Sequence, residues 1–175
     1  FLGNAPVIAV PGALHPLTID YAQGETVAQA VQQVLPGTSG NVLCFLPGAA
    51  EINAAVAAIG NPPGVEVLPL HGSLDAREEE AALSPDSPRR RIIVATNIAE
   101  TSLTVPGVSV VIDAGLQKVA RYDADRGVDS LTLEPITPDS ADQRAGRAAR
   151  LGPGTVRRLW DARDRLRPHR EPEID

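Results

Sequence analysis

The chain contains 175 residues, of which 43% are hydrophobic, and this is enough for one globular domain with a well-buried core. The same composition excludes an intrinsically disordered segment. The formal net charge of -6 argues against a broadly basic surface, so any contact with a nucleic acid has to be local or made by backbone amides.

The sequence also disfavours three further classes of protein, namely membrane proteins, disulfide-stabilised proteins and metal-binding proteins. No apolar run approaches the roughly 18 residues that span a bilayer, and the N-terminal residues lack the pattern of a signal peptide. We therefore expect a soluble, cytoplasmic protein with no membrane partner. The single cysteine, Cys44, lies in an apolar run and is expected to be a small core residue. Because the three histidines are scattered along the chain, we expect no metal site.

The first part of the chain alternates between strand and helix patterns. Residues 7–10 and 17–21 are typical of short extended segments around a turn, and we assign residues 1–23 to an arm or linker from a preceding domain. Apolar residues recur at helical spacing in residues 25–35, which predicts an amphipathic helix. Further strands are predicted at 41–46, 65–70, 91–95 and 108–113, and further helices at 49–59 and 75–83, the last with Asp75 as N-cap.

The second part of the chain adds a hairpin, a basic helix and a last strand at 155–160. Alternation around a turn predicts the β-hairpin at about residues 115–134. The fold class is therefore α/β, with an open, mostly parallel sheet, flanking helices and an inserted hairpin, over residues 24–161. We expect residues 162–175 to be a linker toward a following domain, and the start at Phe1 rather than Met favours a piece of a longer protein.

The basic helix carries three arginines in eight residues, with the sequence Gln-Arg-Ala-Gly-Arg-Ala-Ala-Arg from 143 to 150. A continuous α-helix would place Gln143, Arg147 and Arg150 on one face, with Arg144 pointing elsewhere. Guanidinium forks match phosphate oxygens, and the small residues between them let a polyanion approach. A solvated basic helix explains the same composition equally well.

The sequence lacks the parts that would bind a nucleoside triphosphate by itself. Lys118 is the only lysine, and no Gly-x-x-x-x-Gly-Lys-Ser/Thr loop is present. There is also no Asp-Glu pair at the end of an apolar strand to hold Mg²⁺. If the domain acts on a nucleoside triphosphate, it completes a site whose binding loop lies elsewhere.

Four segments together resemble a known family. Residues 95–104 and 143–150 resemble motifs V and VI of the DEAH-box RNA helicases, and residues 43–48 and 70–74 resemble motifs IV and IVa. The chain is most similar to the bacterial HrpB subgroup. This resemblance implies the second of two RecA-like domains, so that ATP and Mg²⁺ would be bound mainly by a first RecA-like domain outside this chain. The implied partners are single-stranded RNA and that first domain.

The resemblance also implies residue roles. Gln143 would contact the γ-phosphate and its attacking water, and Arg147 and Arg150 would be arginine fingers acting across the domain interface. Other nucleotide-side residues would be Ser102, Thr104 and Leu83. RNA-backbone contacts would come from Thr96, Asn97, Ser73, Gly48 and Lys118. Thr96 and Asn97 also fit ordinary turn residues that cap a short helix, and Lys118 also fits a solvated hairpin residue.

The function expected from the resemblance is the second motor domain of an ATP-dependent RNA helicase, inactive as a fragment. Two alternatives remain open at this point. Contacts made only to phosphates fit a DNA helicase of the same superfamily, since they do not sense the 2′-hydroxyl. A RecA-like platform that binds nucleic acid without ATPase activity is the other alternative.

Overall fold

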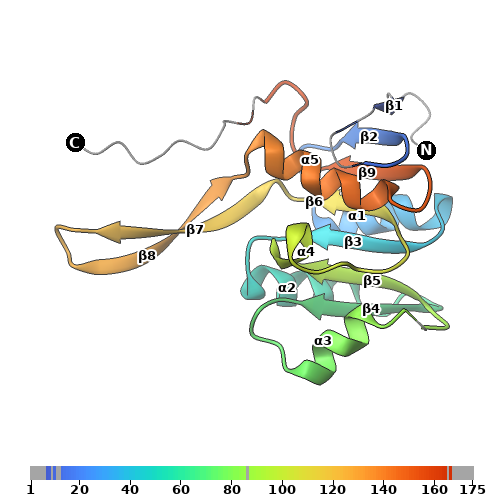
Figure 1. Cartoon of the computed structure of the whole chain (residues 1–175), viewed down its shortest axis with the longest axis horizontal. Helices are drawn as coiled ribbons and strands as arrows, with labels where there is room; N and C mark the ends of the chain where they lie inside the picture. The colour runs from blue at the N-terminus through green and yellow to red at the C-terminus, as the bar shows by residue number, and fades with distance from the viewer. Residues whose placement is uncertain (1–6, 9, 11–12, 86, 165, 167–175) are drawn as a thin grey trace.

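The fold is an open sheet covered by helices on both faces, with a hairpin that projects away from it (Figure 1). A computed structural model describes residues 7–8, 10, 13–85, 87–164 and 166. The seven-stranded sheet has the order β1-β2-β9-β6-β3-β5-β4, in which β1 pairs antiparallel to β2 and every other pair is parallel. The predicted fold class, including the mostly parallel sheet and the inserted hairpin, is confirmed.

The elements follow in chain order. The strands are β1 (Val7–Ile8), β2 (Leu17–Tyr21), β3 (Asn41–Phe45), β4 (Val65–Leu70), β5 (Arg90–Ala95), β6 (Val108–Asp113), β7 (Leu116–Asp123), β8 (Val128–Pro135) and β9 (Gly154–Arg158). The α-helices are α1 (Val27–Val34), α2 (Ala49–Ile59), α3 (Ala76–Leu83), α4 (Ile98–Thr101) and α5 (Pro138–Gly146). Two short 3₁₀ helices, η1 (Leu35–Gly37) and η2 (Arg147–Ala149), continue α1 and α5.

Two hydrophobic layers cover the two faces of the sheet. Because successive strand residues point to opposite faces, Leu43 and Phe45 of β3 belong to the layer under α3, α4 and α5, whereas Val42 and Cys44 belong to the layer under α1 and α2. Cys44 is fully buried, as expected, and this burial raises the pKa of its thiol well above its usual range.

The helix starts follow the capping signals in the sequence. Asp75 caps α3, and the reciprocal bond from its backbone N–H to Glu78 completes the predicted capping box. Thr26 and Gln29 form an equivalent box on α1, which therefore begins two residues later than predicted. Among the described strands, β4 lies at the outer edge of the sheet, pairs only with β5 and contains Pro69 opposite Val94.

One segment contributes more to the sheet than the sequence indicated. Residues 17–21, assigned to the expected arm at 1–23, form β2 beside β9, and Leu17 and Ile19 are buried in the core. Residues 17–21 of that arm are therefore part of the sheet and its core. Most of the expected linker at 162–175 lies outside the described residues.

Gly154, at the start of β9, lies too close to η2 to tolerate a side chain. A Cβ there would overlap the backbone carbonyl of Ala148, whereas a Cβ at Gly152 in the same loop would meet open space. We expect Gly154→Ala to lower the free energy of unfolding by about 2 kcal/mol, in the range of overpacked sites. Urea unfolding of both variants measures this, and an equally small effect of Gly154→Ala and Gly152→Ala would contradict the close approach.

Candidate functional site at the carboxyl edge of the sheet

The loops that follow the parallel strands gather at one edge of the sheet. Backbone hydrogen bonds tie these loops together, since Leu46 N–H donates to Ala95 O (2.8 Å), Thr96 N–H donates to Leu70 O (3.2 Å) and Ala114 N–H donates to Phe45 O (3.2 Å). In open α/β sheets, ligands bind at this edge. The predicted RNA contacts Gly48, Ser73, Thr96 and Asn97 all lie in these loops.

The turn after β5 carries a side-chain amide, that of Asn97, with no hydrogen-bond partner among the described residues. Asn97 precedes α4 and is exposed, but its side chain makes no capping hydrogen bond to that helix. The turn is instead closed by the main chain, with Ala99 N–H donating to Thr96 O (3.2 Å) and Glu100 N–H donating to Asn97 O (2.9 Å). Capping therefore does not use the Asn97 amide, which is available to a ligand.

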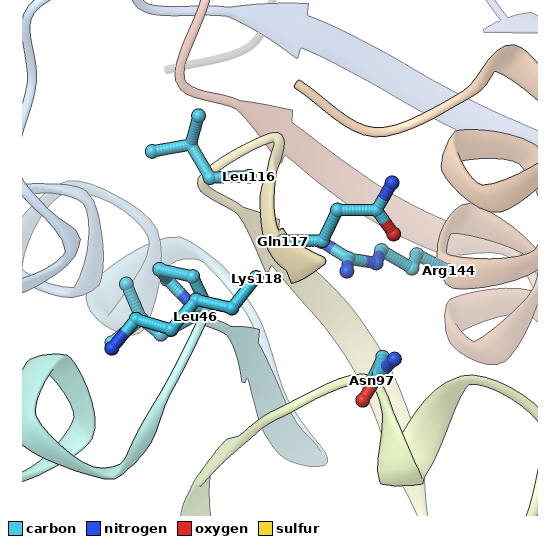
Figure 2. Close-up of a pocket in the computed structure, with 7 residues that line it drawn as sticks. Leu46, Asn97, Leu116, Gln117, Lys118 and Arg144 are labelled. Carbon is cyan, nitrogen blue, oxygen red and sulfur yellow. The ribbon is translucent and has the colours of Figure 1, made fainter. Parts of the chain in front are cut away.

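A small pocket of about 20 Å³ joins this turn to the root of the hairpin. Figure 2 shows Asn97, Gln117, Lys118 and Arg144 around it, contributed by the turn after β5, by β7 and by α5. Such a volume holds about one water molecule. The pocket thus brings together two of the predicted RNA contacts, Asn97 and Lys118.

Lys118 crosses from the hairpin to the start of α2. Its ammonium group pairs with Glu51 Oε1 at 2.7 Å, and a Cβ at Gly48 would lie 2.7 Å from its Nζ atom. Gly48 and Lys118, which are both predicted RNA contacts, are therefore neighbours in space. The pairing also means that Glu51 offsets part of the positive charge that Lys118 would offer to a phosphate.

The arginine helix differs from the predicted continuous α-helix. The α-helix ends at Gly146, and Arg147 begins the 3₁₀ helix η2, whose tighter winding shifts the angular spacing of the residues that follow. Gln143 and Arg150 are exposed and Arg147 is half-buried. The side chains of Gln143 and Arg150 make no hydrogen bond or ion pair with any of the described residues.

Arg147 and Arg150 are electrostatic neighbours despite this change of helix type. Partial burial lowers the pKa of Arg147, the positive charge of Arg150 lowers it further, and the negative charge of Glu100 opposes both effects. Arginine remains protonated at neutral pH even so. These residues therefore place two cations in one neighbourhood of the surface.

Arg144 has the opposite environment, which sequence analysis did not identify. Its side chain is only 1% exposed, and it pairs with Glu100 Oε1 through Nε and with Asp113 Oδ1 through Nη1, both at 2.9 Å. The guanidinium also lies 4.8 Å from the centre of the Phe45 ring. The helical periodicity of the sequence could have indicated this burial, because Arg144 lies on the same side of α5 as the buried residues Ala141 and Ala145.

Glu100 connects Arg144 to Arg147. Its carboxylate accepts hydrogen bonds from Arg144 Nε (2.9 Å) and from Ser140 Oγ (3.1 Å). Its backbone carbonyl accepts a hydrogen bond from Arg147 Nε (2.8 Å) and a second one from Nη2 of the same guanidinium. No local pattern in the sequence marks Glu100, because its partners lie about 40 residues further along the chain.

The expected nucleotide-side residues lie on one face of the sheet. Leu83 ends α3, half-buried against the core layer, and Ser102 and Thr104 are exposed just after α4. The helices α3, α4 and α5 all cover this same face. Leu83, and Leu103 between Ser102 and Thr104, pack against the hydrophobic layer under these helices.

Residues 26–152 match the helicase conserved C-terminal domain family. The chain belongs to this family. It is 37% identical over 187 residues to the ATP-dependent RNA helicase HrpA of Escherichia coli, covering 98% of this chain and 14% of the relative. It is 36% identical to the ATP-dependent RNA helicase HrpB of the same bacterium, covering 99% of this chain and 23% of the relative.

The structural comparison agrees with the family assignment of this helicase domain. The crystal structure of E. coli DEAH/RHA helicase HrpB matches with a TM-score of 0.82 at 34% identity, over 89% of this chain and 22% of that chain. A plant relative, ATP-dependent RNA helicase DEAH12 of Arabidopsis thaliana, is 40% identical over 153 residues, 86% of this chain and 9% of the relative. The helicase domain thus spans less than a quarter of these relatives.

Two further findings concern the described part of the helicase domain. Within it, no group of three or more His, Cys, Asp or Glu side chains is arranged to hold a metal ion. None of its helices has both the length and the apolar character needed to cross a membrane.

The buried pair of Arg144 and Asp113 is expected to dominate the stability of this site. Asp113→Ala leaves a buried guanidinium with one carboxylate, and we expect a loss of about 3 kcal/mol in the free energy of unfolding. Glu134→Ala removes the partner of Arg121 on the exposed hairpin and should cost about 0–1 kcal/mol. Denaturant titrations measure the free energy of unfolding of both variants. Equal losses would show that the buried pair stabilises the domain no more than the exposed pair.

Proposed function

We propose that this domain is the second RecA-like motor domain of an ATP-dependent RNA helicase. The observation that carries this proposal is the pair of cations Arg147 and Arg150 on a domain of the helicase C-terminal family, of which Arg150 has no partner among the described residues. The relatives HrpA and HrpB are named ATP-dependent RNA helicases. The role expected from the sequence is therefore kept for the full-length protein.

Arg147, Arg150 and Gln143 act on ATP that is held mainly, with its Mg²⁺, by the first RecA-like domain. Phosphoryl transfer spreads negative charge over the equatorial oxygens of the γ-phosphoryl group, and guanidiniums placed beside those oxygens stabilise the transition state. Exposed Gln143 orients the attacking water, while Ser102, Thr104 and Leu83 border the nucleotide from the same face of the sheet. Leu83 offers no aromatic ring to stack on a base, which favours loose nucleotide choice.

The RNA backbone binds at the carboxyl edge of the sheet. Thr96 and Asn97 contact phosphates after β5, with further contacts from Gly48, Ser73 and Lys118 in the neighbouring loops and hairpin. Such contacts fix position on the strand without selecting its sequence. A local grip of this kind is compatible with a chain whose net charge is -6.

Domain closure couples the two sites. When ATP is bound to the first RecA-like domain, the surface of this domain that carries Arg147 and Arg150 moves toward it, and hydrolysis releases this surface again. The RNA contacts of this domain therefore move relative to those of the first domain. A fragment without the first domain binds ATP weakly and does not hydrolyse it. The cytoplasmic location expected from the sequence remains a prediction.

Arg150→Ala in the full-length protein tests the catalytic assignment. Loss of an arginine finger should lower kcat for RNA-stimulated ATP hydrolysis by about 10³-fold or more, without unfolding the protein. Arg163→Ala, which removes an exposed arginine that pairs with Asp161, serves as the control and should keep its activity. Wild-type turnover in Arg150→Ala would remove the arginine-finger assignment.

Asn97→Ala tests the RNA assignment. Removal of one phosphate contact should weaken RNA binding about 5-fold, equivalent to about 1 kcal/mol, and by a similar factor for unrelated sequences. Fluorescence anisotropy at one fixed salt concentration measures this, with Asn53→Ala on the exposed side of α2 as control. Stronger ATPase stimulation by DNA than by RNA of the same sequence would favour a DNA-acting helicase.

A further inference from the structure

The orientation of Arg147 depends on one acceptor. Nε and Nη2 of its guanidinium both donate to the carbonyl oxygen of Glu100, with the Nε bond at 2.8 Å, and no carboxylate pairs with Arg147 in the described residues. Two donors on one oxygen fix the plane of the guanidinium, while its remaining N–H groups stay free for a phosphate. The place of the Glu100 carbonyl therefore sets the direction in which Arg147 points.

Glu100 is itself held from α5. Arg144 Nε and Ser140 Oγ each donate to a different carboxylate oxygen of Glu100, at 2.9 and 3.1 Å. The carboxylate is 13% exposed and lies beside a guanidinium that is 1% exposed, so water screens this pair only weakly. Because both donors belong to the helix that leads into Arg147, this arrangement fixes α4 and the arginine segment relative to each other.

Arg144 is anchored on its other side to the sheet. Asp113 Oδ1 accepts from Arg144 Nη1 at 2.9 Å and from the backbone N–H of Gly115 at 2.8 Å, just before the hairpin begins. The other oxygen of Asp113 is buried without a hydrogen-bond partner among the described residues, so its charge is compensated mainly by Arg144. A displacement of Arg144 would therefore leave a buried carboxylate uncompensated, which is costly.

The short helix α4, which contains Glu100, begins directly after the proposed RNA contact Asn97. Thr96 O and Asn97 O accept the N–H groups of Ala99 and Glu100, at 3.2 and 2.9 Å, so the turn after β5 and Glu100 form one hydrogen-bonded unit. A shift of that turn moves the Glu100 carbonyl.

We propose that Glu100, clamped by Arg144 and Ser140, is a positioning residue that aims Arg147 at the transferring phosphate and links that aim to the turn carrying Thr96 and Asn97. This inference rests on the proposed function, because it assigns an orientation to a residue whose catalytic role is proposed above. Glu100 touches neither ATP nor RNA in this mechanism. It acts only through Arg147.

A positioning role has a kinetic signature. Loss of the Glu100 carboxylate leaves Arg147 in place but less well directed, so transition-state stabilisation falls while ATP binding by the first domain is kept. Glu100→Ala should therefore lower kcat of the full-length protein about 10-fold or more, with the KM for ATP changed by less than about 2-fold. Glu100→Gln keeps an acceptor for Arg144 Nε and should recover a large part of that loss.

Glu25→Ala is the matched control. Glu25 is 18% exposed, and its carboxylate, like that of Glu100, accepts two hydrogen bonds, here from Nε and Nη2 of Arg157 at 2.6 and 2.8 Å. It precedes α1, which packs in the other hydrophobic layer. The experiment measures RNA-stimulated ATP hydrolysis and the thermal unfolding midpoint of both alanine variants in the full-length protein. We expect similar shifts in the midpoint and a selective fall of kcat in Glu100→Ala. If Glu100→Ala does not fold, Ser140→Ala takes its place with an expected fall of about 2-fold to 3-fold.

The outcomes separate this inference from the proposed function. If Arg147→Ala and Arg150→Ala abolish hydrolysis while Glu100→Ala and Ser140→Ala match Glu25→Ala in kcat, Glu100 is only a structural residue and the inference is overturned. A rise in the KM for ATP with unchanged kcat in Glu100→Ala would overturn it as well. If Arg147→Ala and Arg150→Ala keep wild-type hydrolysis, the proposed function fails instead.

Discussion

The buried guanidinium of Arg144 is the constraint on which the candidate site depends. Removing an arginine from water is costly, and the cost is offset here by two carboxylates, Glu100 and Asp113, and by the face of the Phe45 ring. These partners come from α4, β6 and β3, so one side chain joins three elements that are distant in sequence. The surface arginines have a defined place because this internal arginine fixes the helix that carries them.

This arrangement also explains how one domain serves two ligand sites. The proposed RNA contacts lie at the carboxyl edge of the sheet, and the proposed nucleotide contacts lie on the face covered by α3, α4 and α5. The helix α4 is only four residues long and connects the two, with Asn97 immediately before it and Glu100 within it. A short, hydrogen-bonded segment of this kind has little freedom to absorb movement, so its two ends shift together.

The sequence was sufficient for the fold but not for the internal contacts of the site. Apolar periodicity and turn signals predicted the alternation of strands and helices, the hairpin and the Asp75 cap, because these features depend on neighbouring residues. The place of Leu17–Tyr21 within the sheet depends on pairing with β9 near the other end of the chain, which local patterns do not encode. The burial of Arg144 likewise depends on carboxylates about 30 and 40 residues away.

The helix type at Arg147 was missed for a related reason. Ala148 and Ala149 favour an α-helix by intrinsic propensity, yet the Ala149 carbonyl accepts the N–H groups of Leu14 and His15. The N–H groups of Leu14 and His15 thus occupy a carbonyl that an α-helix would leave without a donor, because residue 153 is a proline.

The outer edge of the sheet also affects how the molecule behaves at high concentration. The edge strand β4 includes Pro69, which lacks an N–H group and is tolerated in a sheet only where no neighbouring strand needs that donor. A strand from another molecule would find an interrupted row of donors along β4. This edge is therefore a poor template for intermolecular β-sheet growth, which protects a mostly parallel, slowly folding sheet against aggregation.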